Sequence, residues 1–469
     1  MVFSSLVFLF AFLPLTLALY FAAPRRGRNA VLFALSLLFY GWGEPIYILL
    51  MLFEMTVAYA LGFPIAKYRT QAPRRARAAM LLSVCISLSL LFFFKYYQFF
   101  ALNLSRLPYV ALPTIKGLVL PIGISFYTFQ IISYSIDLYR GDCALQRNYI
   151  AFGTYVALFP QLIAGPILRY HDVDVQLTQR TETFEGFSHG VVRFVTGLGK
   201  KVLIGDTLAA GYVYFHALAD ISPTVLGGWL AAVLYSLHLY YDFSGYSDMA
   251  IGLGRMFGFH FPENFNYPYI SESITEFWRR WHVSLSTWFR EYIYIPLGGN
   301  RRGRLKQYRN LAIVWLLTGF WHGANWNFLL WGAYFAVLLI LEKAFLLRFL
   351  ARTPRVFRHT YAVFLILVGF VIFSNVDLAL ALRHIGSLVG VGVVGVASAT
   401  VRYQTLRVLP LLLIAIIGAT PIPRTLWGRL CEKHPRLAAC ALPFCAAVML
   451  FSVSYLVDSA FSPFEYTQF

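Results

Sequence analysis

Charged residues are scarce in this chain of 469 residues. Asp, Glu, Lys and Arg make up 13% of it, whereas hydrophobic residues make up 59%. A soluble globular domain carries about a quarter charged residues, so the composition argues against a soluble fold. The apolar residues are instead concentrated in long windows that contain no charged side chain: 1–23, 78–94, 117–136, 148–168, 221–241, 310–341, 359–376, 384–401, 408–423 and 437–457.

These windows have the length that a membrane helix requires. A bilayer core about 30 Å thick needs roughly 20 apolar residues per helix. The pattern predicts an all-α, polytopic transmembrane fold of roughly 10 to 13 helices, some of them broken or re-entrant. No soluble domain or linker interrupts the pattern, so we expect one membrane domain over 1–469.

Acidic residues are fewer than basic ones, 21 against 39, which gives a formal net charge of +18. Such a charge can attract nucleic acid, but the basic residues lie between apolar windows, as they do in the cytoplasmic loops of membrane proteins. We therefore predict a multi-pass protein of the cell inner membrane, with membrane lipid and no nucleic acid as its partner. The basic clusters, expected as short cytoplasmic loops, are 25–28, 67–77, 301–309, 348–358 and 424–436.

The first apolar window, 1–23, has its basic residues after it and none before it. A cleavable signal peptide carries positive charge ahead of its apolar run. We expect a retained first helix whose amino end lies outside. Further along, Gly41–Pro45 divides the apolar stretch 30–64 and predicts a helical hairpin there.

Cysteine is scarce as well. The chain has five cysteines, and no two of them form a CxxC pair. This spacing argues against a disulfide framework and against a cysteine metal site, so we expect no bound metal. We interpret the cysteines as small residues of the protein core.

The sequence also lacks a GxSxG nucleophile motif, which argues against serine-hydrolase chemistry. Inside the window 310–341, however, stands His322, and an ionisable residue at membrane depth is a functional candidate by default. Gly319, Gly323 and Asn325 surround it, and they predict a broken or closely approached backbone. The two basic flanks of this window indicate a hairpin or a broken helix. The alternative role for His322 is a hydrogen-bonded packing histidine.

Two further clusters contain polar residues among aromatic ones. In 276–291, cations alternate irregularly with aromatic residues around His282, as in an interfacial helix at the membrane surface. In 240–250, Asp242 and Asp248 are six residues apart, a weak signal for a cation site. We interpret the second cluster as a polar network that orients helices or the histidines.

Together these residues suggest acyl transfer. A neutral histidine can act as general base on a hydroxyl, which then attacks an acyl carbonyl without an enzyme-bound intermediate. We predict His322 and His282 as catalytic residues. Arginine matches phosphate geometry, so Arg279 and Arg280 are candidates for holding a coenzyme, with surface anchoring as the alternative. The remaining predicted substrate-binding residues are Asp242 and Asn325.

Six segments resemble the membrane-bound O-acyltransferase family, most closely its bacterial alginate O-acetylase branch. They lie mostly within 117–347 and are Leu120–Gln130, Phe159–Ile167, Tyr241–Asp248, Phe277–His282, Tyr294–Asn300 and Trp321–Ala324. The ending, Ser462–Phe469, is also similar. Beyond 347 the likeness is weaker, because Val371–Asn375 lacks an expected arginine among the C-terminal helices 359–457.

The resemblance implies a role for each part of the reaction. His322 corresponds to the family's catalytic histidine and His282 to its second signature position, in a membrane core with a central tunnel. The implied donor is acetyl-CoA on the cytoplasmic side, used as a substrate and not as a bound cofactor. The implied acceptor is a hydroxyl of an exported polysaccharide, reached through periplasmic acetyltransferase partner proteins.

The sequence also allows two alternatives to an acetyltransferase that uses acetyl-CoA. A polysaccharide or lipid transporter or flippase would also have many helices with buried polar residues, although no paired inverted repeat is visible. Within the enzyme class, the donor could be an acyl carrier protein, as in D-alanyl transfer. The basic segment 301–309 could dock such an acidic carrier or serve as a topology signal.

Overall fold

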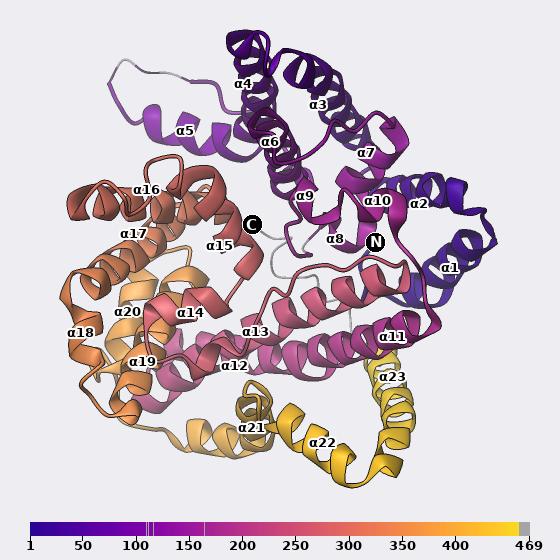
Figure 1. The fold of residues 1–469 in the computed structure, drawn as a ribbon. Helices are drawn as coiled ribbons and strands as arrows, with labels where there is room; N and C mark the ends of the chain where they lie inside the picture. Colours follow the sequence, from indigo (N-terminus) through magenta and orange to yellow (C-terminus); the bar gives the residue numbers. More distant parts are fainter. Residues whose placement is uncertain (109, 111, 116, 164, 459–469) are drawn as a thin grey trace. The chain divides into compact units, whose positions relative to one another are not determined.

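The computed structural model describes residues 1–108, 110, 112–115, 117–163 and 165–458. Over these residues the chain folds almost entirely into helices, and its β-pairing is confined to an isolated bridge between Thr224 and Gly395 (Figure 1). The predicted all-α polytopic fold is confirmed. Ala164 of the Phe159–Ile167 segment and the ending Ser462–Phe469 lie outside the described residues.

The described chain forms two compact units. Unit 1 comprises Met1–Phe194 and Ser247–Pro262, and unit 2 comprises Val195–Tyr246 and 263–458. Two helices, α11 (Phe184–Gly199) and α13 (Val225–Met256), run across the boundaries between the units.

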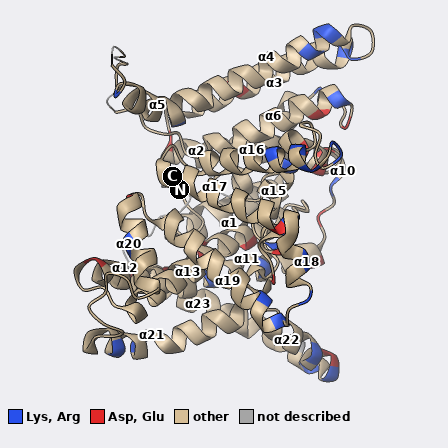
Figure 2. Cartoon of the chain, turned by 90° about the vertical axis from the view of Figure 1, so that its left-hand side faces the viewer, with Lys and Arg blue, Asp and Glu red and all other residues tan. Residues whose placement is uncertain are grey.

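In unit 1, helices α2 and α3 are connected at the place that the sequence predicted. The first apolar run of the predicted hairpin ends with α2 at Gly43, and α3 begins at Ile48. Figure 2 shows basic residues at the end where α3 connects to α4. The helices are α1 (Leu13–Ala22), α2 (Arg28–Gly43), α3 (Ile48–Tyr68), α4 (Pro73–Leu91), α5 (Tyr97–Leu104), α6 (Ile124–Arg140), α7 (Tyr149–Ala157), α8 (Phe159–Leu162), α9 (Tyr170–Val173) and α10 (Gln176–Gln179).

Unit 2 contains the remaining helices. It also contains the π-helical turns Lys200–Gly205, Arg290–Tyr294 and Glu342–Leu346. Its α-helices are α12 (Asp206–Ile221), α14 (Ile274–Arg280), α15 (Val283–Phe289), α16 (Arg304–His322), α17 (Trp326–Leu341), α18 (Leu347–Leu350), α19 (Arg355–Ser374), α20 (Leu378–Leu388), α21 (Ala399–Gly418), α22 (Ile422–Lys433) and α23 (Ala441–Asp458).

The window 310–341 folds as a hairpin of α16 and α17, one of its two predicted forms. Glycines allow the two backbones to approach closely. A Cβ added at Gly319 would lie 2.3 Å from the carbonyl oxygen of Phe328, and one added at Gly332 would lie 2.4 Å from that of Trp315. Even alanine therefore has no room at either position.

Among the described residues, seven helical segments are long and apolar enough to cross a membrane. Several sequence windows form shorter helices instead: 117–136 gives the 17-residue α6, and 148–168 divides between α7 and α8. The seven segments are Ile48–Tyr68, Pro73–Leu104, Phe184–Ile221, Trp326–Leu350, Arg355–Ser374, Ala399–Gly418 and Pro435–Asp458.

Two expectations about local structure are wrong. The basic cluster 424–436 is not a simple loop, because most of it forms α22. Of the cysteines, which we expected in the core, only Cys143 is buried. Cys85 is exposed, in an apolar segment with the length of a membrane span, where the outward side of a helix suits a small apolar residue as well as the core does.

Candidate active site

His322 is the last residue of α16, in the tight turn before α17. Gly323 follows in an extended conformation, and a Cβ added there would lie 2.3 Å from the ring of Phe328. Asn325 then caps α17, since its side-chain oxygen accepts a hydrogen bond of 2.7 Å from the backbone N–H of Trp326. The broken backbone predicted around His322 is confirmed, and the structure gives Asn325 a capping role.

Three aromatic rings surround the His322 imidazole, which is 5% exposed. Their centroids lie 5.1 Å (Trp321), 5.1 Å (Trp331) and 5.3 Å (Phe373) from that of the imidazole. All three contacts are edge-on or T-shaped, a favourable arrangement for such rings. They limit both the rotation of the imidazole and its contact with water.

The Phe373 side of this enclosure is fixed by two buried amides. Asn327 in α17 donates a hydrogen bond of 3.1 Å to the carbonyl oxygen of Phe373. Asn375, just after α19, donates to the carbonyl of Val371 at 2.8 Å and accepts a 3.0 Å hydrogen bond from Nε2–H of His216. In the segment where the family resemblance led us to expect an arginine, neutral polar groups therefore hold the helix end.

His282 lies at the junction between α14 and α15. Its φ of 45° is in the left-handed region, which is unfavourable for a residue with a Cβ and often marks functional sites. Nδ1–H donates to the side-chain oxygen of Asn264 at 3.1 Å, and Ser284 donates to the same oxygen from its N–H and its hydroxyl. Burial lowers the pKa of the His282 imidazole to about 3, so the ring is neutral near pH 7.

This geometry corrects the expectation of a surface helix over 276–291. The segment forms two short helices with a break between them, and Trp278 and Trp288 are buried. Each of the two short helices buries a different face, so the apolar residues are irregularly spaced over the whole segment. The sequence pattern therefore did not predict the break.

The two predicted histidines share a neighbour. The Trp321 ring lies 5.1 Å from the His322 ring and 6.2 Å from the His282 ring. The His282 ring also makes a T-shaped contact with Phe243, with the two ring centroids 4.7 Å apart. The structure thus brings both histidines to one buried, aromatic region of unit 2.

Asp242, next to Phe243, belongs to a buried ionic cluster. The Lys201 ammonium lies 3.0 Å from Asp242 and 2.5 Å from Asp206. Both Lys201 and Asp242 are almost fully buried. Asp248, the other carboxylate of the 240–250 run, pairs in unit 1 with Arg193 at 2.8 Å. The sequence did not identify Lys201 because a lysine outside the apolar windows gives no sign of its burial.

The two predicted arginines differ in exposure. Arg280 forms an ion pair of 2.8 Å with Glu276 and donates to the carbonyl of Asn266 at 3.1 Å. Arg279 is exposed to solvent. Of the two, Arg279 has the freer access to an incoming phosphate.

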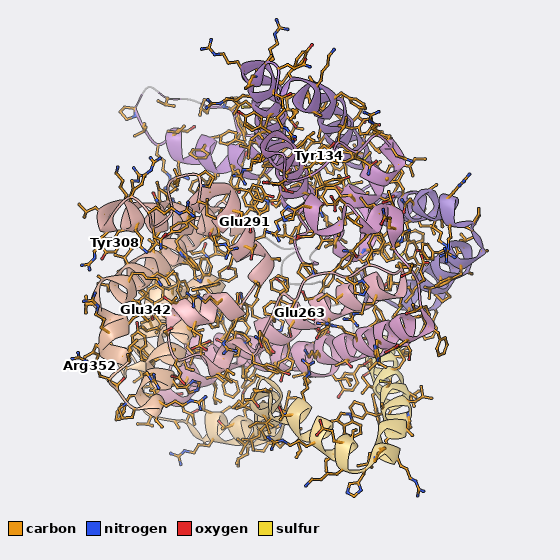
Figure 3. The ribbon with its side chains drawn as sticks, in the orientation of Figure 1. Tyr134, Glu263, Glu291, Tyr308, Glu342 and Arg352 are labelled. Carbon is orange, nitrogen blue, oxygen red and sulfur yellow. The ribbon has the colours of Figure 1, made fainter. Side chains whose placement is uncertain are left out.

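Glu342 is a second residue that the sequence analysis missed (Figure 3). Its buried carboxylate accepts hydrogen bonds from the backbone N–H groups of Ile274 and Thr275 at 2.7 and 2.8 Å, at the start of α14. The Thr275 hydroxyl adds a third at 2.6 Å. Carboxylates stabilise helix N-termini in this way, so Glu342 anchors the helix that leads to His282.

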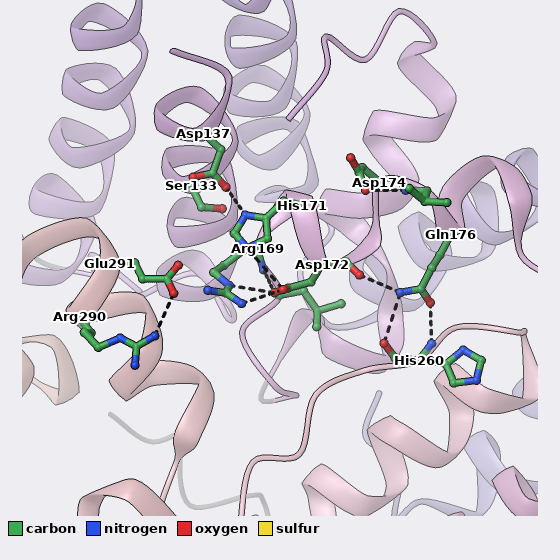
Figure 4. A network of polar contacts seen from close by, with 12 residues as sticks. Ser133, Asp137, Arg169, His171, Asp172, Asp174, Gln176, His260, Arg290 and Glu291 are labelled. Atoms are coloured by element: carbon green, nitrogen blue, oxygen red, sulfur yellow. Dashed lines mark hydrogen bonds and ion pairs between the residues drawn. The ribbon is translucent and has the colours of Figure 1, made fainter. Parts of the chain in front are cut away.

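Another histidine, His171, has a different environment in unit 1 (Figure 4). Its Nδ1 lies 2.8 Å from the buried carboxylate of Asp137, and its Nε2 lies 3.6 Å from Asp172. Arg169 in turn pairs with Asp172 at 2.8 Å. The hydrogen bond with Asp137 raises the pKa of His171.

An all-helical membrane fold with two buried histidines around one tryptophan defines the class of this protein. The model of the membrane-bound O-acyltransferase family matches residues 145–380, and the chain belongs to that family. It is therefore a multi-pass membrane O-acyltransferase, and this membership favours the enzyme over the transporter.

Three similar proteins carry names that specify the kind of acyl transfer. A probable alginate O-acetylase AlgI from Azotobacter vinelandii is 47% identical over 84% of this chain and 79% of its own length. One from Pseudomonas putida is 42% identical over the whole of both chains. A peptidoglycan O-acetyltransferase from Helicobacter pylori is 33% identical over 83% of this chain and 80% of its own length.

Proposed function

We propose that this enzyme acts in the cell inner membrane, where it transfers an acetyl group from cytoplasmic acetyl-CoA toward hydroxyls of an exported alginate-like polysaccharide. The observation that carries the site assignment is that His282 and His322 both contact the ring of Trp321. The choice of acetyl and of alginate is supported by the relatives, which are named as probable alginate O-acetylases.

In this proposal His322 is the general base. It takes the proton of an acceptor hydroxyl as the oxygen attacks the thioester carbonyl; the C–S bond breaks, and the proton passes to the leaving thiolate. The aromatic rings around His322 support this role because they hold the imidazole in place and limit hydrolysis of the thioester by water. His282, neutral and fixed by Asn264, orients the reacting groups.

The remaining predicted residues have supporting roles. Arg279 is the first candidate for binding the coenzyme phosphates because it is exposed. Arg280 is the second candidate because it is already paired with Glu276. Asp242 acts through its ion pair with Lys201, next to the Phe243 ring that contacts His282. Asn325 holds the turn after His322 and is a positioning residue.

Periplasmic acetyltransferase partner proteins complete the proposed reaction. They would receive the acetyl group after it has crossed the membrane and pass it to the polysaccharide. We also propose that the acetyl group crosses the membrane through a central tunnel in the protein.

The test is replacement of His322 by alanine in the producing cells. We expect unchanged membrane abundance and polymer export, with loss of O-linked acetyl groups from the purified exopolysaccharide. His216→Gln is a matched control that changes a histidine of the same unit and keeps an N–H donor for Asn375. Unchanged acetylation in the His322→Ala strain would refute the assignment of the base.

The donor is tested separately with purified enzyme. Radiolabelled acetyl-CoA and acetylated acyl carrier protein are supplied in turn, and labelled product is counted. Transfer from acetyl-CoA supports the proposal. Transfer from the carrier alone would replace the donor and make the basic segment 301–309 its docking candidate.

A further inference from the structure

Helix α22 (Ile422–Lys433) is exposed along its whole length. None of its residues is buried, although it contains several large apolar side chains. It connects α21 to the segment that contains α23, and both of these are long and apolar enough to span a membrane. A helix with this exposure needs a partner outside the described chain to cover its apolar side.

The apolar side of α22 is formed by four residues. Ile422, Leu426 and Leu430 recur at every fourth position, and Trp427 lies beside them. Their exposed fractions are 60%, 56%, 38% and 44% in the order Ile422, Leu426, Leu430 and Trp427. At about 100° per residue they occupy one side of the helix, spread over roughly 140°.

Cations accompany this apolar side. The α22 basic set, which is defined here as Arg424, Arg429, Lys433 and the following Arg436, is opposed by a single acidic residue, Glu432. All four cations are exposed, and Figure 2 shows basic residues along α22. A cationic helix with one apolar side and a tryptophan has the composition of an interfacial membrane helix.

We infer that α22 lies in the membrane interface and binds anionic phospholipid headgroups through its basic set, with Ile422, Leu426, Trp427 and Leu430 in the upper acyl region. The tethering of α22 between two candidate spans supports lipid as the occupant, because both of its ends are held at the bilayer surface. An acidic protein would match the cations but would leave the apolar side in water. Basic residues beside membrane spans attract anionic lipid headgroups.

The first test measures the depth of α22 in the full chain, reconstituted in nanodiscs. Nitroxide labels are attached to Leu426→Cys, on the apolar side, and to Gly428→Cys, about 200° away. An added Cβ at Gly428 meets no atom within 4 Å, so this control fits the structure. The five native cysteines, among them Cys431 of α22, are first replaced by serine or alanine.

We expect the label at position 426 to collide mainly with lipid-soluble oxygen, and the label at position 428 mainly with a water-soluble nickel complex. Frequent collision of both labels with the nickel complex would overturn the inference, since it would place the whole helix in water, and so would frequent collision of both labels with oxygen alone, since it would bury both sides in lipid.

The second test measures lipid preference. Changing the whole basic set to glutamine should lower the ratio of phosphatidylglycerol to phosphatidylethanolamine that co-purifies with the protein by about tenfold, whereas changing its arginines to lysine should not. An unchanged lipid ratio would overturn the inference. So would a complex with acidic acyl carrier protein that forms in place of lipid binding and depends on the α22 basic set. The matched control neutralises four cations elsewhere: Arg301, Arg302, Arg304 and Lys306.

Discussion

The environments of His322 and His171 differ in almost every respect. His322 is enclosed by aromatic rings in unit 2, whereas His171 in unit 1 is partly exposed and lies beside the carboxylates of Asp137 and Asp172. A carboxylate partner favours the imidazolium form, which cannot accept a proton. An apolar enclosure favours the neutral ring that a general base requires. The comparison teaches that the two histidines are held by different kinds of neighbour: aromatic rings enclose His322, and carboxylates flank His171.

The largest expected effect tests this contrast directly. His322→Gln should lower the rate of acetyl transfer by purified enzyme about 10²- to 10⁴-fold, because the base is lost. His171→Gln should leave that rate near the parental value. Both are measured with saturating acetyl-CoA, and similar losses in the two variants would erase the proposed distinction.

The next prediction concerns the ionic cluster of unit 2. Lys201→Met leaves the carboxylates of Asp206 and Asp242 without their shared cation, and should destabilise the fold by about 3–5 kcal/mol. Thermal unfolding in detergent and membrane abundance both report the loss. Lys200→Met is the adjacent control. A Lys201→Met protein as stable as the control would show that the cluster contributes little.

A smaller effect is expected at Asn264, which fixes His282. Asn264→Ala removes the acceptor of three hydrogen bonds and should destabilise the protein by about 1–3 kcal/mol in total, with a parallel fall in kcat. Asn264→Gln keeps a neutral amide oxygen and should restore part of the kcat. If the alanine variant keeps full kcat, His282 does not depend on this support.

The smallest effect is the pH dependence due to His171. Its pKa is raised above the usual 6.5, so its pairing with Asp137 stabilises the fold fully below about pH 6.5 and less as the pH rises through the raised value. The difference in melting temperature between the parent and His171→Gln should therefore be largest in mildly acidic buffer and shrink in alkaline buffer. A difference that grows with pH would contradict the assignment of the ion pair.

The sequence predicted the parts of the site that depend on local pattern. Glycines beside His322 in an uncharged window predicted the broken backbone, and the structure has a hairpin turn there. The partners of the site were not predicted, because they are distant in the chain: Asn264 is 18 residues from His282, and Glu342 is 68 from Ile274. Burial of Lys201 depends on Asp242 as well as on the nearby Asp206, and Asp242 comes from a separate helix, α13, which no local period encodes.

The contact between Gly319 and Gly332 also bears on how the protein responds to its bilayer. Because the α16 and α17 backbones interlock at these glycines, the two helices cannot slide past one another without a clash. A membrane of different thickness would have to be met by tilting the hairpin as one rigid body. The register between His322 and Trp331 would then be the same in thin and thick bilayers, which makes the geometry of the site insensitive to lipid chain length.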